Sequence, residues 1–343
     1  MKSSYKKSDV ELLLKDLTDK VNTISIDKKN KMQKNGLDVK DVVTDEFPID
    51  KKYFDICFDT TKVYAKQTAI AVGNLAEQIY KIKKENAVLV SILRAGTLTG
   101  ILVKRYLKNK YNINVFHYSI SLPNFDKQNE IKYILSKHKA KDIIFIDGWT
   151  GKGTATKKIE DFASKINDLG TDLALLSDSI NICKFCGIRE DIAIPQAPFN
   201  ACVTGLVGIP ITSSKYINKD DFTGSTYLEK LEKIDITNWY IDLIEQNFDY
   251  KLCNSDNYKE NVNPVEELSE LCFKYSVESK DVNPGINEAA RAILRRNLKK
   301  LLVKDKSDIQ VMQIVKLAQY KNIEIEEYNF KYYKAATIAY PDI

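Results

Sequence analysis

The stretch Asp142–Phe162 reads DIIFIDGWTGKGTATKKIEDF, and it decides the fold class. The apolar run Ile143–Ile146 predicts a buried strand, which ends at Asp147. A turn rich in threonine and glycine follows, and a helical pattern begins after it. Backbone amides of such a turn, aimed by a helix N-terminus, suit a phosphate, while an acid at the strand end suits a sugar hydroxyl or Mg²⁺. We therefore expect an α/β protein with its active site at this turn.

Two other phosphate motifs fit this turn less well. A P-loop requires G-x-x-x-x-G-K-[ST], but Gly151-Lys152 is followed by Gly153, which puts the Mg²⁺-binding hydroxyl out of register. A dinucleotide-binding turn requires G-x-G-x-x-G, and no third glycine follows Thr154-Ala155-Thr156. A glycine turn without any ligand is the remaining alternative. The strand, the acid, the turn and the helix together favour phosphate.

A second turn of the same kind follows the apolar run Ala87–Ile92, which also predicts a buried strand. The turn Leu93–Gly96 leads into an amphipathic helical pattern. Arg94 and the backbone around Ala95-Gly96 would thus lie at the carboxyl end of a strand, where open α/β sheets bind ligands. A guanidinium at that place can bind two phosphate oxygens at once, although an arginine exposed on a loop is the plainer alternative. A further strand, Asn114–Ser121, separates the two turns.

Together the two turns resemble those of a type I phosphoribosyltransferase. In that fold one turn holds the pyrophosphate of phosphoribosyl pyrophosphate and a later Asp-…-Thr-Gly turn holds its 5-phosphate. The ILRAG segment Ile92–Gly96 looks like the pyrophosphate loop of uracil phosphoribosyltransferases. The resemblance implies a mainly parallel sheet flanked by helices. One departure is Gly148, which stands where the family usually has a second acid.

A closer resemblance covers most of the chain. The segments SYKKSDVELLLKDL (4–17), FIDGWTGKGTAT (145–156) and REDIAIPQAPFNACVTGL (189–206) look like the StiP-type family of phosphoribosyltransferase-like proteins from bacterial tellurite-resistance and stress operons. Members often carry a Pelota-type RNA-binding domain. Two segments depart from the family. Residues 35–48 replace a usual Gly-Gly-His-Tyr-Ser segment, and 122–128 replace an Arg-Gly-rich flap, so that the flap arginine is missing.

The resemblance implies a phosphoribosyltransferase, a glycosyltransferase of nucleotide metabolism acting at C1 of ribose 5-phosphate with Mg²⁺ as cofactor. Its partners would be phosphoribosyl pyrophosphate or a nucleotide-like small molecule, and it allows a homodimer. The implied catalytic residues are Asp147, Arg94 and Lys152. Asp147 is the residue that could also bind the metal directly. The implied phosphate-binding residues are Thr150, Gly151, Gly153, Thr154, Ala95 and Gly96. Tyr118 and Ser119 would belong to the flap, and Asn200 and Thr204 to the acceptor side.

Two other functions stay open at this point. The altered flap suits a non-catalytic sensor that binds a nucleotide and RNA. Family members are also labelled cysteine proteases, and a cysteine nucleophile needs a histidine within hydrogen-bond reach. The histidines of the chain are His117 and His138. Nothing in the sequence pairs either of them with Cys202, which lies in a predicted strand, or with Cys57. Most free cysteines are small buried hydrophobes.

Composition points to a soluble protein of a reducing compartment. Six cysteines in 343 residues without a signal peptide predict free thiols in the cytoplasm. Cys183 and Cys186 have the spacing of half a zinc site, but no second pair follows. No apolar run approaches the roughly 20 residues that span a bilayer. A net charge of +5 is too small to argue for nucleic-acid binding by itself.

The length allows two domains. We expect a first domain over residues 1–254, with an N-terminal extension or hood over 1–55. A polar linker follows over 255–264, and a smaller α/β/α domain over 265–343. In the second domain, helices are predicted at Val265–Tyr275, Ile286–Asn297 and Asp308–Tyr320, and strands at Lys300–Lys304 and Ile323–Tyr328.

The second domain resembles the Pelota and kink-turn-binding superfamily. Its GINEAARAIL segment, Gly285–Leu294, has the order of the hallmark Gly-x-Asn-Glu-x-x-Lys, with arginine in the last place. The resemblance implies RNA binding by Asn287, Glu288, Arg291 and Arg295. Between Gly285 and Lys306 there are seven basic and two acidic residues. A helix with a solvated basic face is the alternative.

Overall fold

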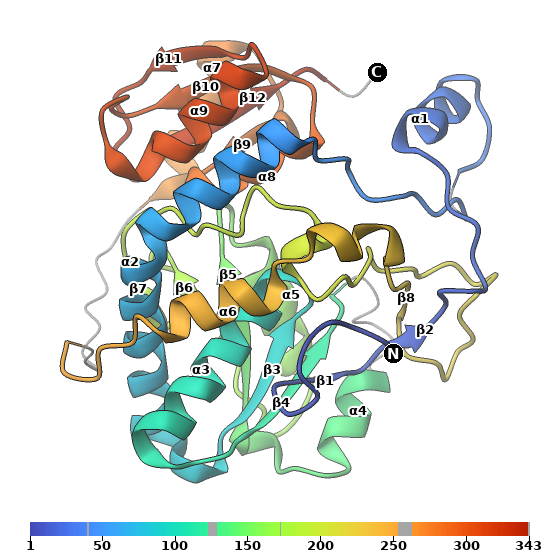
Figure 1. Ribbon diagram of the computed structural model, residues 1–343, viewed down its shortest axis with the longest axis vertical. Coiled ribbons are helices and arrows are strands. Elements are labelled where there is room, and N and C mark those ends of the chain that lie inside the picture. Colours follow the sequence, from blue (N-terminus) through green and yellow to red (C-terminus); the bar gives the residue numbers. More distant parts are fainter. Residues whose placement is uncertain (40, 123–128, 172, 253–262, 342–343) are drawn as a thin grey trace.

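The computed structural model describes residues 1–39, 41–122, 129–171, 173–252 and 263–341, and it contains a larger N-terminal and a smaller C-terminal domain (Figure 1). The N-terminal domain is built on a six-stranded sheet in the order β1-β4-β3-β5-β6-β7, and its neighbouring strands pair in parallel. The strands are β1 (Glu11–Leu12), β3 (Val88–Ile92), β4 (Phe116–Ile120), β5 (Ile143–Trp149), β6 (Leu173–Ser177) and β7 (Cys186–Ile188). The predicted mixed α/β class with a mostly parallel sheet is confirmed. The finer assignment to the type I phosphoribosyltransferase fold stays a prediction.

Helices cover both faces of this sheet, which explains why its inner strands β3 and β6 are buried along their whole length. Alternate residues of one strand face opposite sides, so Leu89 belongs to one hydrophobic cluster and its neighbours Val88 and Val90 to another. The first cluster includes side chains of α2 (Lys51–Lys83), α3 (Ala95–Tyr111) and α6 (Thr237–Glu245). The second includes those of α4 (Asn129–Leu135) and α5 (Thr154–Ala163). The order strand, turn, helix predicted for β3–α3 and β5–α5 is confirmed.

Smaller elements complete the N-terminal domain. The short strands β2 (Lys15–Asp16) and β8 (Gly224–Ser225) pair in parallel, and α1 (Ile26–Lys34) lies apart from the sheet (Figure 1). Single 3₁₀ turns occur at η1 (Lys84–Asn86), η2 (Ala140–Asp142), η3 (Ala201–Val203) and η4 (Glu229–Ile234). The strand predicted around Cys202 is wrong, because the Asn200 side chain accepts a hydrogen bond from the Cys202 amide and starts the turn η3 instead.

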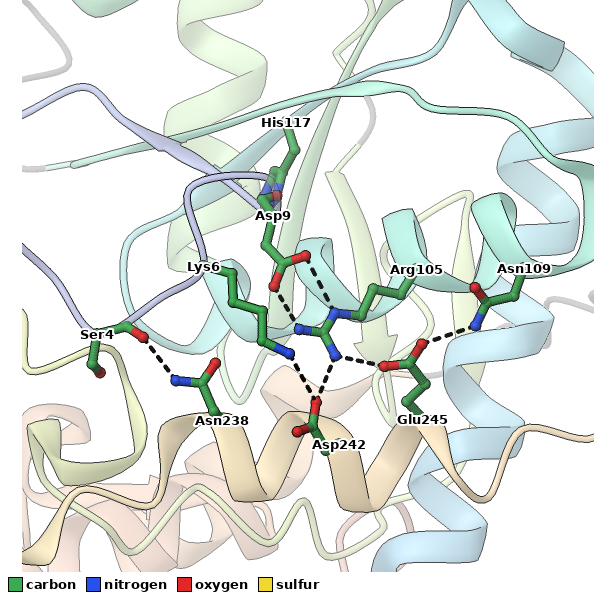
Figure 2. A network of polar contacts seen from close by, with 9 residues as sticks. All are labelled: Ser4, Lys6, Asp9, Arg105, Asn109, His117, Asn238, Asp242 and Glu245. Atoms are coloured by element: carbon green, nitrogen blue, oxygen red, sulfur yellow. Dashed lines mark hydrogen bonds and ion pairs between the residues drawn. The ribbon is translucent and has the colours of Figure 1, made fainter.

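A buried arginine holds the N-terminal segment against the domain (Figure 2). Its guanidinium, on Arg105 of α3, contacts the carboxylate of Asp9 at 2.6 Å and those of Asp242 and Glu245 on α6 at 2.8 and 2.5 Å. The Asp9 carbonyl also lies 2.9 Å from Nδ1 of His117 on β4. These contacts join the N-terminal segment to α3, β4 and α6, and they fix β1 at the edge of the sheet.

The C-terminal domain has a four-stranded sheet in the order β11-β10-β12-β9. Its strands are β9 (Val282–Pro284), β10 (Leu298–Val303), β11 (Glu324–Glu327) and β12 (Ala335–Ala339), and its helices are α7 (Pro264–Tyr275), α8 (Ile286–Arg295) and α9 (Met312–Tyr320). The 3₁₀ turns η5 (Ser279–Asp281) and η6 (Ile309–Val311) connect them. The predicted helices and strands are present, while β9 and β12 were not predicted.

The two domains share one hydrophobic core. The cluster around α2 and α3 continues into α8 and α9, with Ile286, Ile293, Ile314 and Leu317 among its buried side chains. The helix α2 runs along both domains (Figure 1). The site described next is therefore bounded by elements that pack together. Among the described residues, no helix is long and apolar enough to cross a membrane.

Candidate functional site between the two domains

A pocket of about 430 Å³ lies where the carboxyl ends of β3 and β5 meet the C-terminal domain. The N-terminal domain lines it with Arg94, Ala95, Asp147, Trp149, Thr150, Gly151, Lys152, Thr154, Lys158, Gln196, Asn200 and Thr204, among others. The C-terminal domain contributes Asn283, Pro284, Glu288, Arg291 and Arg295. The structure thus brings together both predicted turns and part of the predicted RNA-binding helix.

Arg94 lies in the turn between β3 and α3 and adopts a backbone φ of +80°, which is rare outside glycine. The Thr97 hydroxyl accepts a hydrogen bond from the Arg94 amide at 3.1 Å and stabilises this turn. The guanidinium forms a bidentate pair with Glu46, with both distances at 2.8 Å. Burial alone would raise the pKa of Glu46, but the Arg94 guanidinium holds it below its usual range. Two donors of Arg94 are therefore already engaged by an internal carboxylate.

Asp147 is the carboxylate that the N-terminal domain places in the pocket. It follows the apolar run Ile143–Ile146 within β5, and the Gly148 amide donates to its Oδ1 at 2.7 Å. Burial raises the pKa of Asp147 to about 7, and the nearby Arg291 partly opposes this rise. A Cβ on Gly96 would lie 2.6 Å from the Ile146 carbonyl, so only glycine lets α3 start this close to Asp147. A carboxyl that titrates near neutral pH can both donate and accept a proton.

The turn predicted to cradle a phosphate makes contacts within the protein. The Thr150 hydroxyl accepts a hydrogen bond from the Gly153 amide at 2.9 Å, and Tyr333 donates to the Gly151 carbonyl at 2.8 Å. Lys152 donates to the Ser279 carbonyl. A Cβ on Gly151 would lie 2.6 Å from the carbonyl of Pro284. Part of this turn therefore forms the contact surface for the C-terminal domain.

The helix α8 forms the opposite wall. Its Glu288 accepts a hydrogen bond from the Trp149 indole at 3.0 Å and pairs with Arg291 at 3.3 Å, and the Arg291 guanidinium lies 5.9 Å from the Trp149 ring. One turn further on, Nε of Arg295 is buried and has no hydrogen-bond partner in the described part of the chain. Burial, with the neighbouring Arg94 and Arg291, lowers the pKa of Arg295 to about 9. The pocket thus contains a charged donor that no described group satisfies.

Asn287 does not line the pocket. It is 3% exposed, its Oδ1 accepts from the Ile194 amide at 2.7 Å, and its Nδ2 donates to the Ile192 carbonyl at 2.8 Å. This side chain therefore joins the two domains. Of the four residues predicted to bind RNA, Glu288, Arg291 and Arg295 face the pocket.

Four other predicted site residues lie outside the pocket lining. Tyr118 and Ser119 are 2% and 0% exposed in β4, where Tyr118 bonds to His138 at 2.9 Å and Ser119 to Thr97 at 2.7 Å. They belong to the sheet and not to a flap, because both are buried within a strand. Gly96 and Gly153 lie behind the lining, and residues 123–128 of the predicted flap lie outside the described residues.

Sequence reasoning missed several residues of the site. Trp149 stands inside the decisive stretch, yet its role depends on Glu288, which is 139 positions away. Glu46 and Gln196 belong to no recognisable sequence motif, and only the folding of the chain brings them to the site. Lys158 could have been found, because it lies one helical turn beyond Thr154 at the start of α5.

The described residues contain no cluster of three or more His, Cys, Asp or Glu side chains that could hold a metal ion. Asp147 and Glu288 are the carboxylates of the pocket lining, and Glu288 is engaged by Trp149 and Arg291. The Mg²⁺ cofactor stays a prediction.

The cysteines and histidines are not paired as a catalytic dyad within the described ranges. Cys57, Cys183, Cys186 and Cys202 are buried and Cys272 is partly exposed. Burial raises the pKa of the Cys202 thiol to about 12. His117 bonds through Nε2 to the Ser91 hydroxyl at 2.7 Å, and burial lowers its pKa to about 3. Among these cysteines Cys202 lies nearest to the pocket in sequence, between the lining residues Asn200 and Thr204.

Comparisons with known proteins agree on the two parts of the chain. A family model described as "Tellurite-like stress resistance cysteine protease StiP" matches residues 3–245, and the PELOTA RNA binding domain matches residues 262–340. A curated protein of Acinetobacter baylyi, "Cysteine protease StiP", is 24% identical over 334 residues, which cover 89% of this chain and 85% of that protein. No solved structure matches significantly.

These names correct the predicted activity. The family model and the curated relative are both named as a cysteine protease, which is a hydrolase, so the prediction of a phosphoribosyltransferase or other glycosyltransferase is wrong. Phosphoribosyl pyrophosphate as a partner and a homodimer find no support. The predicted link to tellurite-like stress resistance and the C-terminal Pelota domain are confirmed.

Proposed function

This chain belongs to the StiP family, and we propose that its role in stress resistance begins with the binding of an anionic ligand in the pocket between its two domains. The pocket lining carries Arg94, Lys152, Lys158, Arg291 and Arg295 against the carboxyl groups of Asp147 and Glu288. This surplus of positive charge favours a phosphate or a carboxylate.

The proposal rests on the unsatisfied hydrogen-bond donor of Arg295. Its Nε is buried without a hydrogen-bond partner in the described residues, and an unsatisfied buried donor costs about 1–3 kcal/mol. The other two arginines of the pocket have partners within the protein, since Arg94 pairs with Glu46 and Arg291 with Glu288. An anion bound beside Arg295 would satisfy its free donor and raise its lowered pKa.

Asp147 would take up a proton when the anion binds. Its pKa of about 7 leaves it partly ionised at neutral pH, and a second negative charge nearby favours its protonated form. The same carboxyl could later return the proton to a reacting group. Anion binding near neutral pH should therefore be accompanied by proton uptake.

Calorimetric titration of inorganic phosphate into the full chain tests this proposal. Repeating the titration in two buffers of different ionisation enthalpy measures the protons taken up. We expect saturable binding with proton uptake at pH 7.5, and binding without that uptake in Asp147→Asn. If the wild-type chain binds neither phosphate nor a short polyphosphate, the proposal is wrong.

Peptide-bond hydrolysis by a thiol is the second candidate, favoured by the names of the family and of the relative. A nucleophile within residues 3–245 would be Cys57, Cys183, Cys186 or Cys202. Cys202 is the best placed, because Asn200 and Thr204 on either side of it line the pocket.

This second candidate requires a change at Cys202. A thiol with a pKa of about 12 is ionised in roughly one molecule in 10⁵ at pH 7. The charged groups that act on the Cys202 thiol are Asp235, Glu46 and Arg94, and neither histidine is among them. A substrate would therefore have to open η3 towards the pocket, exposing the sulfur to water and to a proton acceptor.

Cleavage of denatured casein by purified protein tests the thiol. We expect Cys202→Ser to abolish cleavage and Cys183→Ser to retain it, since Cys183 is equally buried but lies away from the pocket lining. Wild-type protein that leaves casein intact, or Cys202→Ser protein that cleaves it normally, would rule out this candidate.

A further inference from the structure

We propose that the anion bound in the pocket is the phosphate backbone of a single-stranded RNA segment, held by both domains together. The pocket and the RNA site of the C-terminal domain would then be one site. This inference rests on the anion binding proposed above and names the class of ligand.

Two cations of the pocket belong to the domain that matches an RNA-binding model. Arg291 and Arg295 lie one turn apart on α8, and both line the pocket. Two other basic residues of that segment, Lys300 and Arg296, have partners inside the domain. Lys300 pairs with Glu324 and Glu326 at 3.0 and 2.7 Å, and Arg296 bonds to the Lys280 carbonyl at 2.6 Å.

The buried guanidinium of Arg295 favours a phosphate ligand. Its Nε has no hydrogen-bond partner in the described part of the chain, although it belongs to a pocket-lining side chain. A phosphate oxygen is a strong acceptor with charge opposite to the guanidinium. The site is therefore arranged for an acceptor that comes from outside the protein.

Five cations line the pocket, more than one small anion requires. Arg94, Arg291 and Arg295 line the pocket together with the exposed side chains of Lys152 and Lys158. Cations spread from buried to exposed positions fit several phosphates in a row better than one small ion. Binding that depends on phosphates is steeply salt-dependent and tolerant of base sequence.

Fluorescence anisotropy of a short labelled single-stranded RNA, titrated with the full chain at several salt concentrations, tests the inference. We expect Arg295→Ala to weaken RNA binding roughly tenfold and to reduce the salt slope by about 1. Lys158→Ala should act in the same direction, and it cannot disturb the core because the side chain is exposed. The matched control is Lys304→Ala, an exposed lysine of the C-terminal domain outside the pocket lining, which should change the affinity less than about twofold.

Several outcomes would overturn the inference. One is an RNA affinity that is unchanged in Arg295→Ala and Lys158→Ala but falls in Lys304→Ala, because RNA would then bind outside the pocket. Another is equal binding of polyglutamate, which would make the ligand an acidic peptide. If phosphate binds the wild type and not Arg295→Ala while RNA binding is unchanged, the RNA inference fails and the anion site stands. Thermal unfolding of each variant separates loss of binding from loss of fold.

Discussion

Asp147 lies near the carboxyl end of β5, and its side chain lines a pocket that contains three arginines. Its pKa is nevertheless raised, because burial opposes ionisation more strongly than Arg291 favours it. The stability of the protein should therefore depend on pH through this carboxyl, even without a ligand.

Replacing Asp147 by asparagine should stabilise the protein at high pH. The folded-state pKa of about 7 lies above the unfolded value of 3.8, so folding binds a proton between these values and stability falls as pH rises through this window. The variant lacks this penalty. We expect Asp147→Asn to unfold at a higher temperature than wild type at pH 8 and at the wild-type temperature at pH 3.5. Equal unfolding temperatures at pH 8 would contradict the raised pKa.

Gly100 on α3 is needed for the packing of the helix against the sheet. A Cβ at this position would overlap the Ser91 hydroxyl and the His117 ring, which are hydrogen-bonded to each other at 2.7 Å. We expect Gly100→Ala to lower the free energy of unfolding by about 1–3 kcal/mol, measured by urea denaturation. Gly170→Ala is the control, because a Cβ there has nothing within 4 Å. If both variants have similar free energies of unfolding, the packing around Gly100 does not require glycine.

Single residues were predictable where a local pattern carries them. Asp147 and Arg94 follow apolar strands, and the structure places both in the pocket. Glu46, by contrast, contacts Arg94 across 48 positions of sequence, and no local pattern marks it. The free donor of Arg295 could not be foreseen either, since it results from what surrounds the helix after folding.

At the scale of elements, α2 connects the two domains. Its Tyr64 hydroxyl donates to the Ile309 carbonyl at 2.7 Å, and its Thr60 hydroxyl accepts from Gln313 at 2.8 Å. Further along, its Asn74 and Gln78 donate to the backbone of β7 at 3.1 and 2.7 Å. The helix therefore couples the C-terminal domain to the main sheet.

Removing the Tyr64 hydroxyl should weaken this coupling. We expect Tyr64→Phe to lower the free energy of unfolding by about 1 kcal/mol, since it leaves the Ile309 carbonyl without its donor. Tyr80→Phe, on the same helix, is the matched control, because the Tyr80 hydroxyl makes no hydrogen bond among the described residues. The account of α2 fails if both variants denature at the same urea concentration.

Long apolar patterns predicted elements well, and short ones did not. The strands β3 and β5 and helices α3 and α8 were expected from their own residues. The strand β9 has three residues and includes Pro284, and it exists through its pairing with β12, more than 50 positions away. Pairing at such a distance leaves no signal in the local sequence.

The whole molecule depends on the contact between its domains. Asp191 of the N-terminal domain is buried, and it accepts hydrogen bonds from the Ile286 amide at 3.0 Å and the Lys334 amide at 2.8 Å. Both donors belong to the C-terminal domain, and the first lies at the start of α8. The order of the domains was visible in the sequence, but their close packing and shared pocket were not, since these arise from residues with no common motif.

Removing the Asp191 carboxylate should loosen this contact. Asp191→Ala leaves the buried amide of Ile286 and the part-buried amide of Lys334 without an acceptor, and we expect it to lower the free energy of unfolding by about 2–4 kcal/mol. The measurement is urea denaturation, with the exposed Asp161→Ala as control. A variant as stable as this control would show that Asp191 does not hold the domains together.

Binding of an anion between the cations of the two domains can be followed by the fluorescence of Trp149, which lies in the pocket and is one of two tryptophans in the chain. Trp239→Phe removes the other signal and preserves the aromatic stacking on Phe58.

In this background, titration with inorganic phosphate should change the Trp149 emission saturably, and adding Arg295→Ala should abolish the change. An emission that stays constant at phosphate concentrations that saturate the calorimetric signal would contradict the claim. So would an equal change in the Arg295→Ala protein, because the anion would then lie away from the C-terminal wall of the pocket.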